Sequence, residues 1–349
     1  MGQDLHGQAI SPAAVTGGRN RTGGRTVLVT GAAGFIGSHV CEALLSRGDR
    51  VVGIDNFDSY YAEHLKRANV APALEHPSYT LIEGDINSAA DLDRAFSHAP
   101  FHGVIHLAAR AGVRPSLKNP VLYNEVNVLG TTRLTERMRQ CDSGHLVHAS
   151  SSSVYGSRST VPFREEDHAD RPSSPYAATK RSNELSLHAF HHLYGTPVTC
   201  LRFFTAYGPR QRPEMAIHKF ANLIDNGEAV PIFGDGSAQR DYTFIADVVG
   251  GVLRALDRPN GYRIYNLGTT DTTPLLHLAQ RIAAHLDRPL RVQYQPEQPG
   301  DVPITCADIS RAVAELGYKP VVQLEEGLSR FVDWFRETRA AEAAEVTAA

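Results

Sequence analysis

The chain has 349 residues, of which 42% are hydrophobic and 21% charged, and its formal net charge is −3 at neutral pH. This composition is typical of a globular protein with one large α/β unit or two smaller ones. The charge gives no electrostatic reason to expect nucleic acid or an anionic membrane as partner. No apolar run in the sequence reaches the roughly 18 residues that span a bilayer.

The two ends differ in composition from the rest of the chain. Residues 1–24 are rich in Gly, Arg, Thr and Asn without an apolar period, which predicts a disordered segment and no secretory signal. Residues 338–349 predict a flexible, fraying helical tail. The four cysteines form no Cys-x-x-Cys pair, which indicates reduced thiols and a cytoplasmic protein; they are Cys41, Cys141, Cys200 and Cys306.

From residue 26 onward, apolar runs alternate with amphipathic segments. The expected strands are, in order, TVLVTGAAGFIG, which ends in glycines, RVVGIDNFD, which ends at Asp55, YTLIEGDI, GVIHLAA, HLVHASSSSVYG and VTCLRFFTAYGP. The spacing predicts helices after the first strand and over 88–98, 120–139 and 175–194. This alternation predicts an α/β, Rossmann-type, doubly wound parallel sheet that binds ligands at the carboxyl ends of its strands.

The rhythm changes beyond residue 204, where Gly- and Pro-rich segments are mixed with short helices and strands. We expect a Rossmann domain over 25–204, to which 241–268 returns through the run YRIYNLG. Residues 205–240 and 269–337 are expected to form a smaller C-terminal α/β substrate lobe.

The stretch TGAAGFIG places Gly31, Gly34 and Gly37 between the first strand and its helix. Residues without Cβ let a backbone turn tightly and approach a pyrophosphate at a helix N-terminus. Asp55 ends the next strand, where a carboxylate accepts hydrogen bonds from ribose hydroxyls and repels a 2′-phosphate, which favours NAD over NADP. Asp85 ends the third strand, either as an adenine contact or as a helix N-cap.

The stretch SPYAATK predicts a helix with Ser174 as N-cap and Pro175 as its first residue. Tyr176 and Lys180 then lie one turn apart on one face. A phenol with a pKa of about 10 is a poor base. A nearby ammonium and a positive nicotinamide ring favour phenolate, and a lowering by three units corresponds to roughly 4 kcal/mol. A surface aromatic–cation pair is the alternative.

Four motifs, TGAAGFIG, HLAA, SSSSVYG and YAATK, together resemble the extended short-chain dehydrogenase/reductase family in its nucleotide-sugar epimerase and dehydratase branch. The similarity covers about residues 26–336. It implies a tightly bound, recycled NAD and a homodimer packed through helices that include 120–139 and 176–194. It also implies a catalytic triad of Ser151, Tyr176 and Lys180, in which Ser151 contacts the sugar O4.

Two positions beside Ser151 separate the members of this branch. Dehydratases carry Asp-Glu, and UDP-glucuronate decarboxylases keep a Glu, where this chain has Ser152 and Ser153. Elimination therefore lacks its acid and base, which favours simple epimerisation. The stretches DNFDSYYAEHLK, GVRPSLKNP and QPGDVPITCAD resemble UDP-glucuronate 4-epimerases. A UDP-glucose 4-epimerase, a decarboxylase, a reductase and a non-catalytic nucleotide sensor remain alternatives.

The stretch YGPRQRPEM bears on the sugar. The family pattern reads Trp-Gly where this chain has Arg210 and Gln211, whereas Arg212 matches it. A uronic acid needs a site for its C6 carboxylate, and a guanidinium with neighbouring hydroxyls supplies one. Because a 4-keto uronic acid is a β-keto acid, the enzyme must hold that carboxylate away from the alignment that releases CO2.

The glycine turn and the resemblance together give the expected contacts of each ligand. Those to NAD are Gly31, Gly34, Phe35, Ile36, Gly37, Asp55, Asn56, Asp85, Ile86, Leu107, Ala108, Ala109, Asn127, Tyr176 and Lys180. Those to the UDP-sugar are Ser151, Ser152, Ser153, Thr205, Arg212, Met215, Arg240 and Asp301. Three histidines in strand-like runs, at 106, 145 and 148, are expected in the core, and no spacing predicts a metal site.

Overall fold

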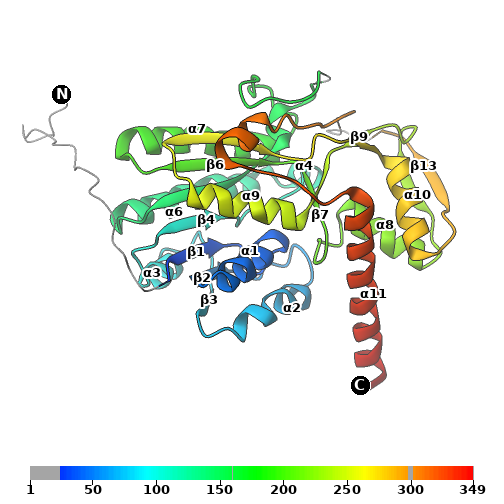
Figure 1. The fold of residues 1–349 in the computed structure, drawn as a ribbon, viewed down its shortest axis with the longest axis horizontal. Coiled ribbons are helices and arrows are strands. Elements are labelled where there is room, and N and C mark those ends of the chain that lie inside the picture. The colour runs from blue at the N-terminus through cyan, green and yellow to red at the C-terminus, as the bar shows by residue number, and fades with distance from the viewer. Residues whose placement is uncertain (1–23, 159, 298–301, 349) are drawn as a thin grey trace, which may run out of the picture.

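The computed structural model describes residues 24–158, 160–297 and 302–348. Its centre is a seven-stranded sheet with the order β11-β6-β5-β4-β1-β2-β3, in which all neighbouring strands are parallel (Figure 1). The strands are β1 (Thr26–Thr30), β2 (Arg50–Asp55), β3 (Tyr79–Glu83), β4 (Gly103–His106), β5 (His145–Ser151), β6 (Val198–Phe203) and β11 (Tyr262–Leu267). The Rossmann-type α/β prediction is confirmed.

Helices cover both faces of this sheet, because its central strands are apolar on both sides. One layer holds α1 (Phe35–Ser46), α2 (Glu63–Leu74) and α9 (Ile245–Asp257). The other holds α3 (Ala89–Phe96), α6 (Gly130–Gln140) and α7 (Pro175–Tyr194). Each layer has its own core of buried side chains, on opposite sides of the sheet.

Three short segments precede α6 and one follows β5. The expected helix over 120–139 is divided into α5 (Pro120–Tyr123), the π-helical turn η1 (Asn124–Leu129) and α6, with α4 (Val113–Lys118) just before it. The 3-10 turn η2 (Ser152–Tyr155) continues directly from β5. Helix α2 was not expected, because Lys66, Asn69, Val70 and Ala73 are its buried residues and give it only a weakly apolar face.

The expected sixth strand is two strands in the structure. β6 stops at Phe203, and β7 (Thr205–Tyr207) leaves the main sheet to pair with β10 (Tyr242–Phe244). The amide of Thr205 donates to the carbonyl of Asp241 at 3.0 Å, which draws the chain away from the main sheet. The polypeptide therefore turns into the smaller lobe at the residue where the sheet ends.

The smaller lobe lies beside the carboxyl edge of the sheet (Figure 1). Its strands pair as β8 with β13 and as β9 with β12. They are β8 (Val230–Phe233), β9 (Gln239–Arg240), β12 (Thr273–Pro274) and β13 (Val292–Gln295), with α8 (Ala216–Asp225), α10 (Leu275–Leu286) and α11 (Leu324–Ala348). The π-turn η3 (Ala312–Leu316) lies instead against α9 and β11 of the main sheet. Helix α11 extends as far as Ala348. The flexibility expected of residues 338–349 stays a prediction, and so do the expected domain boundaries.

Candidate active site

A pocket of about 380 Å³ lies at the carboxyl ends of β1, β2, β4, β5 and β6. Parallel strands end together there, so side chains far apart in sequence line one cavity. The pocket brings together most of the expected ligand contacts. They are Gly31, Gly34, Phe35, Ile36, Gly37, Asp55, Asn56, Asp85, Ile86, Leu107, Ala108, Ala109, Ser151, Ser152, Ser153, Tyr176, Lys180, Thr205, Arg212 and Met215.

The three glycines of the first turn serve different purposes. A Cβ on Gly31 would lie 2.7 Å from the amide nitrogen of Ala108, and one on Gly37 would lie 2.0 Å from the carbonyl oxygen of Gly31. Internal packing therefore requires both. A Cβ on Gly34 would meet only that carbonyl oxygen, at 3.2 Å. Gly34 precedes α1 and lines the pocket, so its bare backbone fits a phosphate at the helix N-terminus.

Asp55 is held by the glycine turn that it faces. Its carboxylate accepts hydrogen bonds from the amides of Ala33 at 3.0 Å and Phe57 at 2.9 Å. Burial raises its pKa, which these amides and Lys66 partly offset. The carboxylate is thus fixed at the end of β2 with lone pairs directed along the pocket wall, where a ribose would lie.

Asp85 has its own partners at the end of β3. Its carboxylate accepts from the side chain of Asn56 at 2.9 Å and from the amide of Asn87 at 2.7 Å. The N-cap of α3 is Ser88, whose hydroxyl accepts from the amide of Asp91. The N-cap alternative for Asp85 is therefore wrong, and its contact with adenine stays a prediction.

Asn127 lies behind the wall of the pocket and not in its lining. It is 1% exposed, and its amide oxygen accepts from the backbone nitrogen of Arg110 at 2.7 Å. Its amide nitrogen donates to the carbonyl of Arg110 at 3.0 Å and lies 3.0 Å from the hydroxyl of Thr179. This side chain therefore joins the loop after β4 to α7, which supports the wall.

Ser151, Tyr176 and Lys180 converge where β5 ends and α7 begins. Ser174 caps α7 by accepting from the amide of Ala177 at 3.1 Å, and Pro175 is the first helical residue, as the sequence predicted. Tyr176 and Ser151 both line the pocket there, and the Ser151 hydroxyl acts to lower the pKa of Tyr176. The elements that position the triad are therefore one strand end and one capped helix.

Burial has the largest effect on the pKa values of Tyr176 and Lys180 in this triad. It raises the pKa of Tyr176, and the Ser151 hydrogen bond and the charge of Arg212 only partly offset the rise. Burial also lowers the pKa of Lys180 to about 8. The ammonium of Lys180 donates to the carbonyl of Ala149 at 2.8 Å and lies 6.0 Å from the centre of the Tyr176 ring. Burial therefore opposes the expected phenolate, which the positive ring of a bound nicotinamide would favour.

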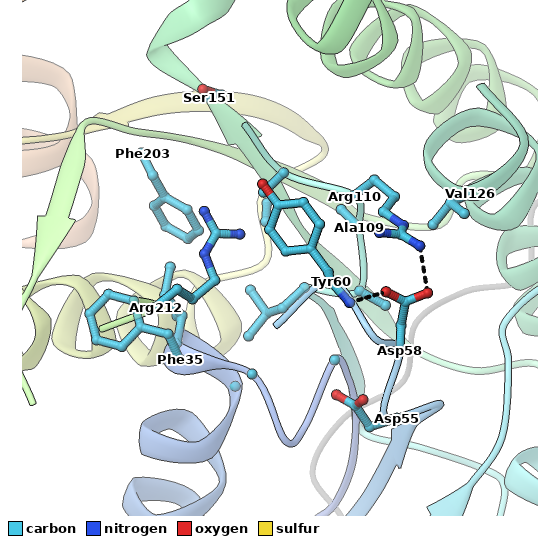
Figure 2. A pocket seen from close by; sticks show the side chains of 18 of the residues that line it. Phe35, Asp55, Asp58, Tyr60, Ala109, Arg110, Val126, Ser151, Phe203 and Arg212 are labelled. Atoms are coloured by element: carbon cyan, nitrogen blue, oxygen red, sulfur yellow. Dashed lines mark hydrogen bonds and ion pairs between the residues drawn. The ribbon is translucent and has the colours of Figure 1, made fainter. Parts of the chain in front are cut away.

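Three loops meet across the pocket at a cluster that the sequence did not predict (Figure 2). Tyr60 lies between two arginines, with the guanidinium carbon of Arg212 at 5.4 Å and that of Arg110 at 5.5 Å from its ring centre. Arg110 is also paired with Asp58 at 2.6 Å, and Asp58 accepts from the amide of Tyr60. Stacking between separate loops has no local spacing signal, although Tyr60 lies in the stretch DNFDSYYAEHLK.

Of the expected substrate residues, Arg240 does not line the pocket. Arg240 belongs to β9 and donates to the carbonyl of its neighbour Gln239 at 2.8 Å. Asp301 lies outside the described residues. Both roles stay predictions.

The histidines of the strands are core residues, as expected. His106 is hydrogen-bonded on both ring nitrogens, to Thr30 and Thr131, and burial lowers its pKa to about 3. His148 is fully buried beside it with no hydrogen-bond partner, at a ring distance of 5.3 Å. Within the described ranges, no group of His, Cys, Asp and Glu could hold a metal ion.

The chain is similar to proteins of known family over nearly its whole length. The family model described as GDP-mannose 4,6 dehydratase matches residues 28–331. The chain belongs to this family. A UDP-glucuronate 4-epimerase of Arabidopsis thaliana, number 5, is 45% identical over 331 residues, which cover 90% of this chain and 76% of the relative.

Solved structures of the family share the fold. A UDP-glucuronic acid 4-epimerase from Bacillus cereus, in complex with UDP-glucuronic acid and NAD, superposes with a TM-score of 0.85 at 35% identity and covers 90% of this chain and 99% of its own. A UDP-N-acetylglucosamine 4-epimerase from Methanobrevibacter ruminantium gives a TM-score of 0.83 at 32% identity, covering 91% and 100%. Members of one fold thus act on different sugars, and the pocket must decide between them.

Proposed function

We propose that this protein is an NAD-dependent UDP-glucuronate 4-epimerase, which converts UDP-glucuronate to UDP-galacturonate. The observation that carries this proposal is the lining of the pocket beside the triad. Ser152 and Ser153 are hydroxyls where an elimination needs an acid and a base, and Arg212 brings a guanidinium to the same cavity. The site therefore suits a substrate with a carboxylate and a reaction without elimination.

The cofactor site fits NAD by its donor set. The bare backbone of Gly34 and the N-terminus of α1 suit the diphosphate, and Asp55 suits a ribose with free hydroxyls. Bound NAD supplies reversible hydride transfer at C4 of the sugar. Because that hydride would return to the sugar in the same turnover, no second substrate would be needed.

The residues of the triad transfer one proton to and from the sugar. Tyr176 takes the O4 proton as C4 is oxidised and returns it when C4 is reduced on the other face. Ser151 hydrogen-bonds O4 and holds it towards the phenol. Lys180, fixed by the carbonyl of Ala149, binds the nicotinamide ribose and contributes positive charge. Between the two transfers, the keto-sugar turns about its diphosphate linkage.

The carboxylate of the sugar is held by Arg212 with the hydroxyls of Ser152, Ser153 and Thr205, all in the lining of the pocket. Several fixed donors hold the C5–carboxylate bond away from the π system of the ketone better than a single charge does. This geometry retains the carboxylate through the 4-keto stage.

The protein is proposed to act as a homodimer. The helices α4 to α7 expose large apolar side chains that a partner copy would cover, namely Leu117 (45%), Val121 (65%), Leu129 (43%), Leu185 (57%), Leu193 (67%) and Tyr194 (52%). A cytoplasmic location is proposed from the four free thiols, two of them buried. No helix in the described ranges is long and apolar enough to cross a bilayer.

The test is to incubate the purified protein with UDP-glucuronate, without added cofactor, and to follow the sugar by proton NMR. UDP-galacturonate is the expected product. UDP-xylose with CO2 would instead make the protein a decarboxylase. If UDP-glucuronate is unchanged even with added NAD while UDP-glucose is converted, the protein is a UDP-glucose 4-epimerase.

A further inference from the structure

The carboxylate site depends on a loop that we call the arginine loop, residues 208–215. It carries Arg212 from the end of β7 to the start of α8, and it contains the pair Arg210–Gln211 that departs from the family pattern. In the structure neither member of this pair lines the pocket. Any effect of this changed pair on the sugar is therefore indirect.

Gln211 is 2% exposed and ties the arginine loop to both of its neighbours. Its side-chain nitrogen donates to the carbonyl of Ala206 in β7 at 3.0 Å. Its side-chain oxygen accepts from the amide of His218, the third residue of α8, at 3.1 Å. The N-cap position of α8, Met215, makes no side-chain bond to the helix, so the amide of Gln211 serves as a remote cap.

The far end of this connection is rigid. The ring of His218 donates to the backbone carbonyl of Gln211, so the two residues are joined twice. The same ring packs against Phe331 at 5.9 Å and Trp334 at 5.5 Å. Gln211 is thereby fixed to the aromatic packing of α8 and α11, and the next residue is Arg212.

The other side of the arginine loop is attached to the cofactor domain. Arg210 pairs with Glu42 of α1 at 2.6 Å, and the ring of His39 is bonded to the carbonyl of Pro209 at 3.0 Å. Arg210 has φ +65°, a conformation that disfavours side chains, so the loop is held here by its contacts and not by local preference. Arg212 thus lies between two anchored neighbours.

We infer that Gln211 is a positioning residue that sets the place of the Arg212 guanidinium, and with it the selectivity for a uronic acid and the retention of its carboxylate. This inference rests on the proposed function. Within the arginine loop, Arg212 pairs through Nε with Glu214 at 3.0 Å, and its carbonyl accepts from the amide of Met215. A shift of the backbone at 211 therefore moves the whole cation.

A misplaced cation changes the fate of the keto-sugar. After the C4 hydride has passed to NAD⁺ and the O4 proton to Tyr176, the intermediate is a β-keto acid. If its carboxylate aligns with the ketone, the C5–C6 bond breaks, CO2 leaves and the electron pair forms an enolate that takes a proton at C5. Return of the hydride then gives a UDP-pentose, and without that return the reduced cofactor stays with a 4-keto pentose.

The test is the variant Gln211→Met, which keeps the volume and removes both side-chain hydrogen bonds. KM and kcat are measured with UDP-glucuronate and with UDP-glucose, CO2 and UDP-pentose are quantified, and NAD content and Tm report on the fold. We expect KM for UDP-glucuronate to rise roughly tenfold with a smaller change for UDP-glucose, and UDP-pentose to appear. Gln280→Met, an exposed glutamine of α10, is the matched control and leaves all values unchanged.

The outcomes separate the two proposals. A wild-type protein that does not convert UDP-glucuronate would overturn the proposed function, and the inference with it. A wild-type protein that converts it, while Gln211→Met keeps the wild-type KM, sugar preference and a product free of UDP-pentose, would overturn the inference alone. An equal loss with both sugars and a lowered Tm would show that Gln211 serves only stability. Should Gln211→Met fail to fold, Gln211→Glu keeps the acceptor for α8 and carries the same test.

Discussion

The catalytic edge of the sheet and the arginine loop present their functional groups in different ways. Ser151 ends β5, and Tyr176 and Lys180 follow a capped helix start, so backbone hydrogen bonds of regular elements fix the triad. Arg212 belongs to a loop without regular structure, and buried Gln211 and the Arg210–Glu42 pair hold it. In the proposed function, the proton chemistry thus depends on the fold itself, whereas the choice of sugar depends on a few side-chain contacts.

This difference suits a family in which one fold handles several sugars. A change at the catalytic edge should reduce the rate of the proton chemistry, while a change in the arginine loop should alter the sugar preference and leave that chemistry intact. The two regions should therefore respond differently to substitution. The variants below test that separation, beginning with the largest effect.

Tyr176→Phe is expected to abolish proton transfer at the catalytic edge of the sheet. The substitution removes one hydroxyl from a half-buried side chain that lines the pocket, and it keeps the ring packed against Tyr123. We expect kcat to fall roughly a thousandfold, because the variant lacks the group that is proposed to take the O4 proton. NAD content and the affinity for UDP-glucuronate, measured by calorimetry, should stay close to wild type. A variant that keeps a tenth of the wild-type kcat would contradict the role of Tyr176.

Arg212→Met removes the functional group of the arginine loop instead. It removes the charge-assisted hydrogen bonds to the carboxylate while leaving the triad in place, so KM for UDP-glucuronate should rise roughly thirtyfold. KM for UDP-glucose should change much less. Arg212→Lys is the informative companion, since an ammonium keeps the charge without the planar fork. Equal changes in KM for both sugars would remove Arg212 from the carboxylate site.

His148→Phe tests the sheet beneath the catalytic edge. Burial lowers the pKa of His148 well below its usual 6.5, so the unfolded chain takes up this proton first and stability is lost as the pH falls below 6.5. Lys180 and His106 are the charged or titratable groups that face it. Between pH 6.5 and 5 the variant should lose less free energy of unfolding than wild type, by at most about 2 kcal/mol.

The measurement is urea unfolding at several pH values. His277→Phe, at an exposed position on α10, is the control and should keep the wild-type pH dependence. An unchanged slope in His148→Phe would mean that the buried ring carries a proton in the folded protein.

Glu42→Gln is the variant with the smallest expected effect on KM, and it tests one contact that holds the arginine loop. The partner Arg210 is 18% exposed and Glu42 32%, so solvent screens the pair and its contribution is below about 1 kcal/mol. KM for UDP-glucuronate should rise no more than about threefold, with kcat unchanged. Glu63→Gln, which removes an exposed pair within α2, should leave KM as it is. A loss in kcat would show that the arginine loop also serves the proton chemistry.

The same division explains what the sequence could predict. The glycine turn, Asp55 and the pair Tyr176–Lys180 lie in short contiguous motifs, whose spacing matches a strand, a turn or one helical turn. Parallel strands then bring those motifs to one edge, so fold and cofactor pocket follow from local patterns. The depressed pKa of Lys180 and the raised pKa of Tyr176 do not follow from spacing, because they come from burial.

Contacts between distant loops could not be predicted from the sequence. Tyr60 lies between arginines that follow it by 50 and 152 residues, and no periodicity connects them. Asn127 was expected at the cofactor, but its amide is used by the backbone of Arg110. Gln211 stood out only as a departure from the family pattern, and its burial gave that departure a physical meaning.

The most direct test of the account uses UDP-glucuronate deuterated at C4, incubated with the purified protein and no added cofactor. The account predicts UDP-galacturonate that keeps the deuterium at C4 and loses no CO2, because one bound cofactor takes the hydride and returns it to the other face. Deuterium exchanged with solvent, or a UDP-pentose as the main product, would contradict it.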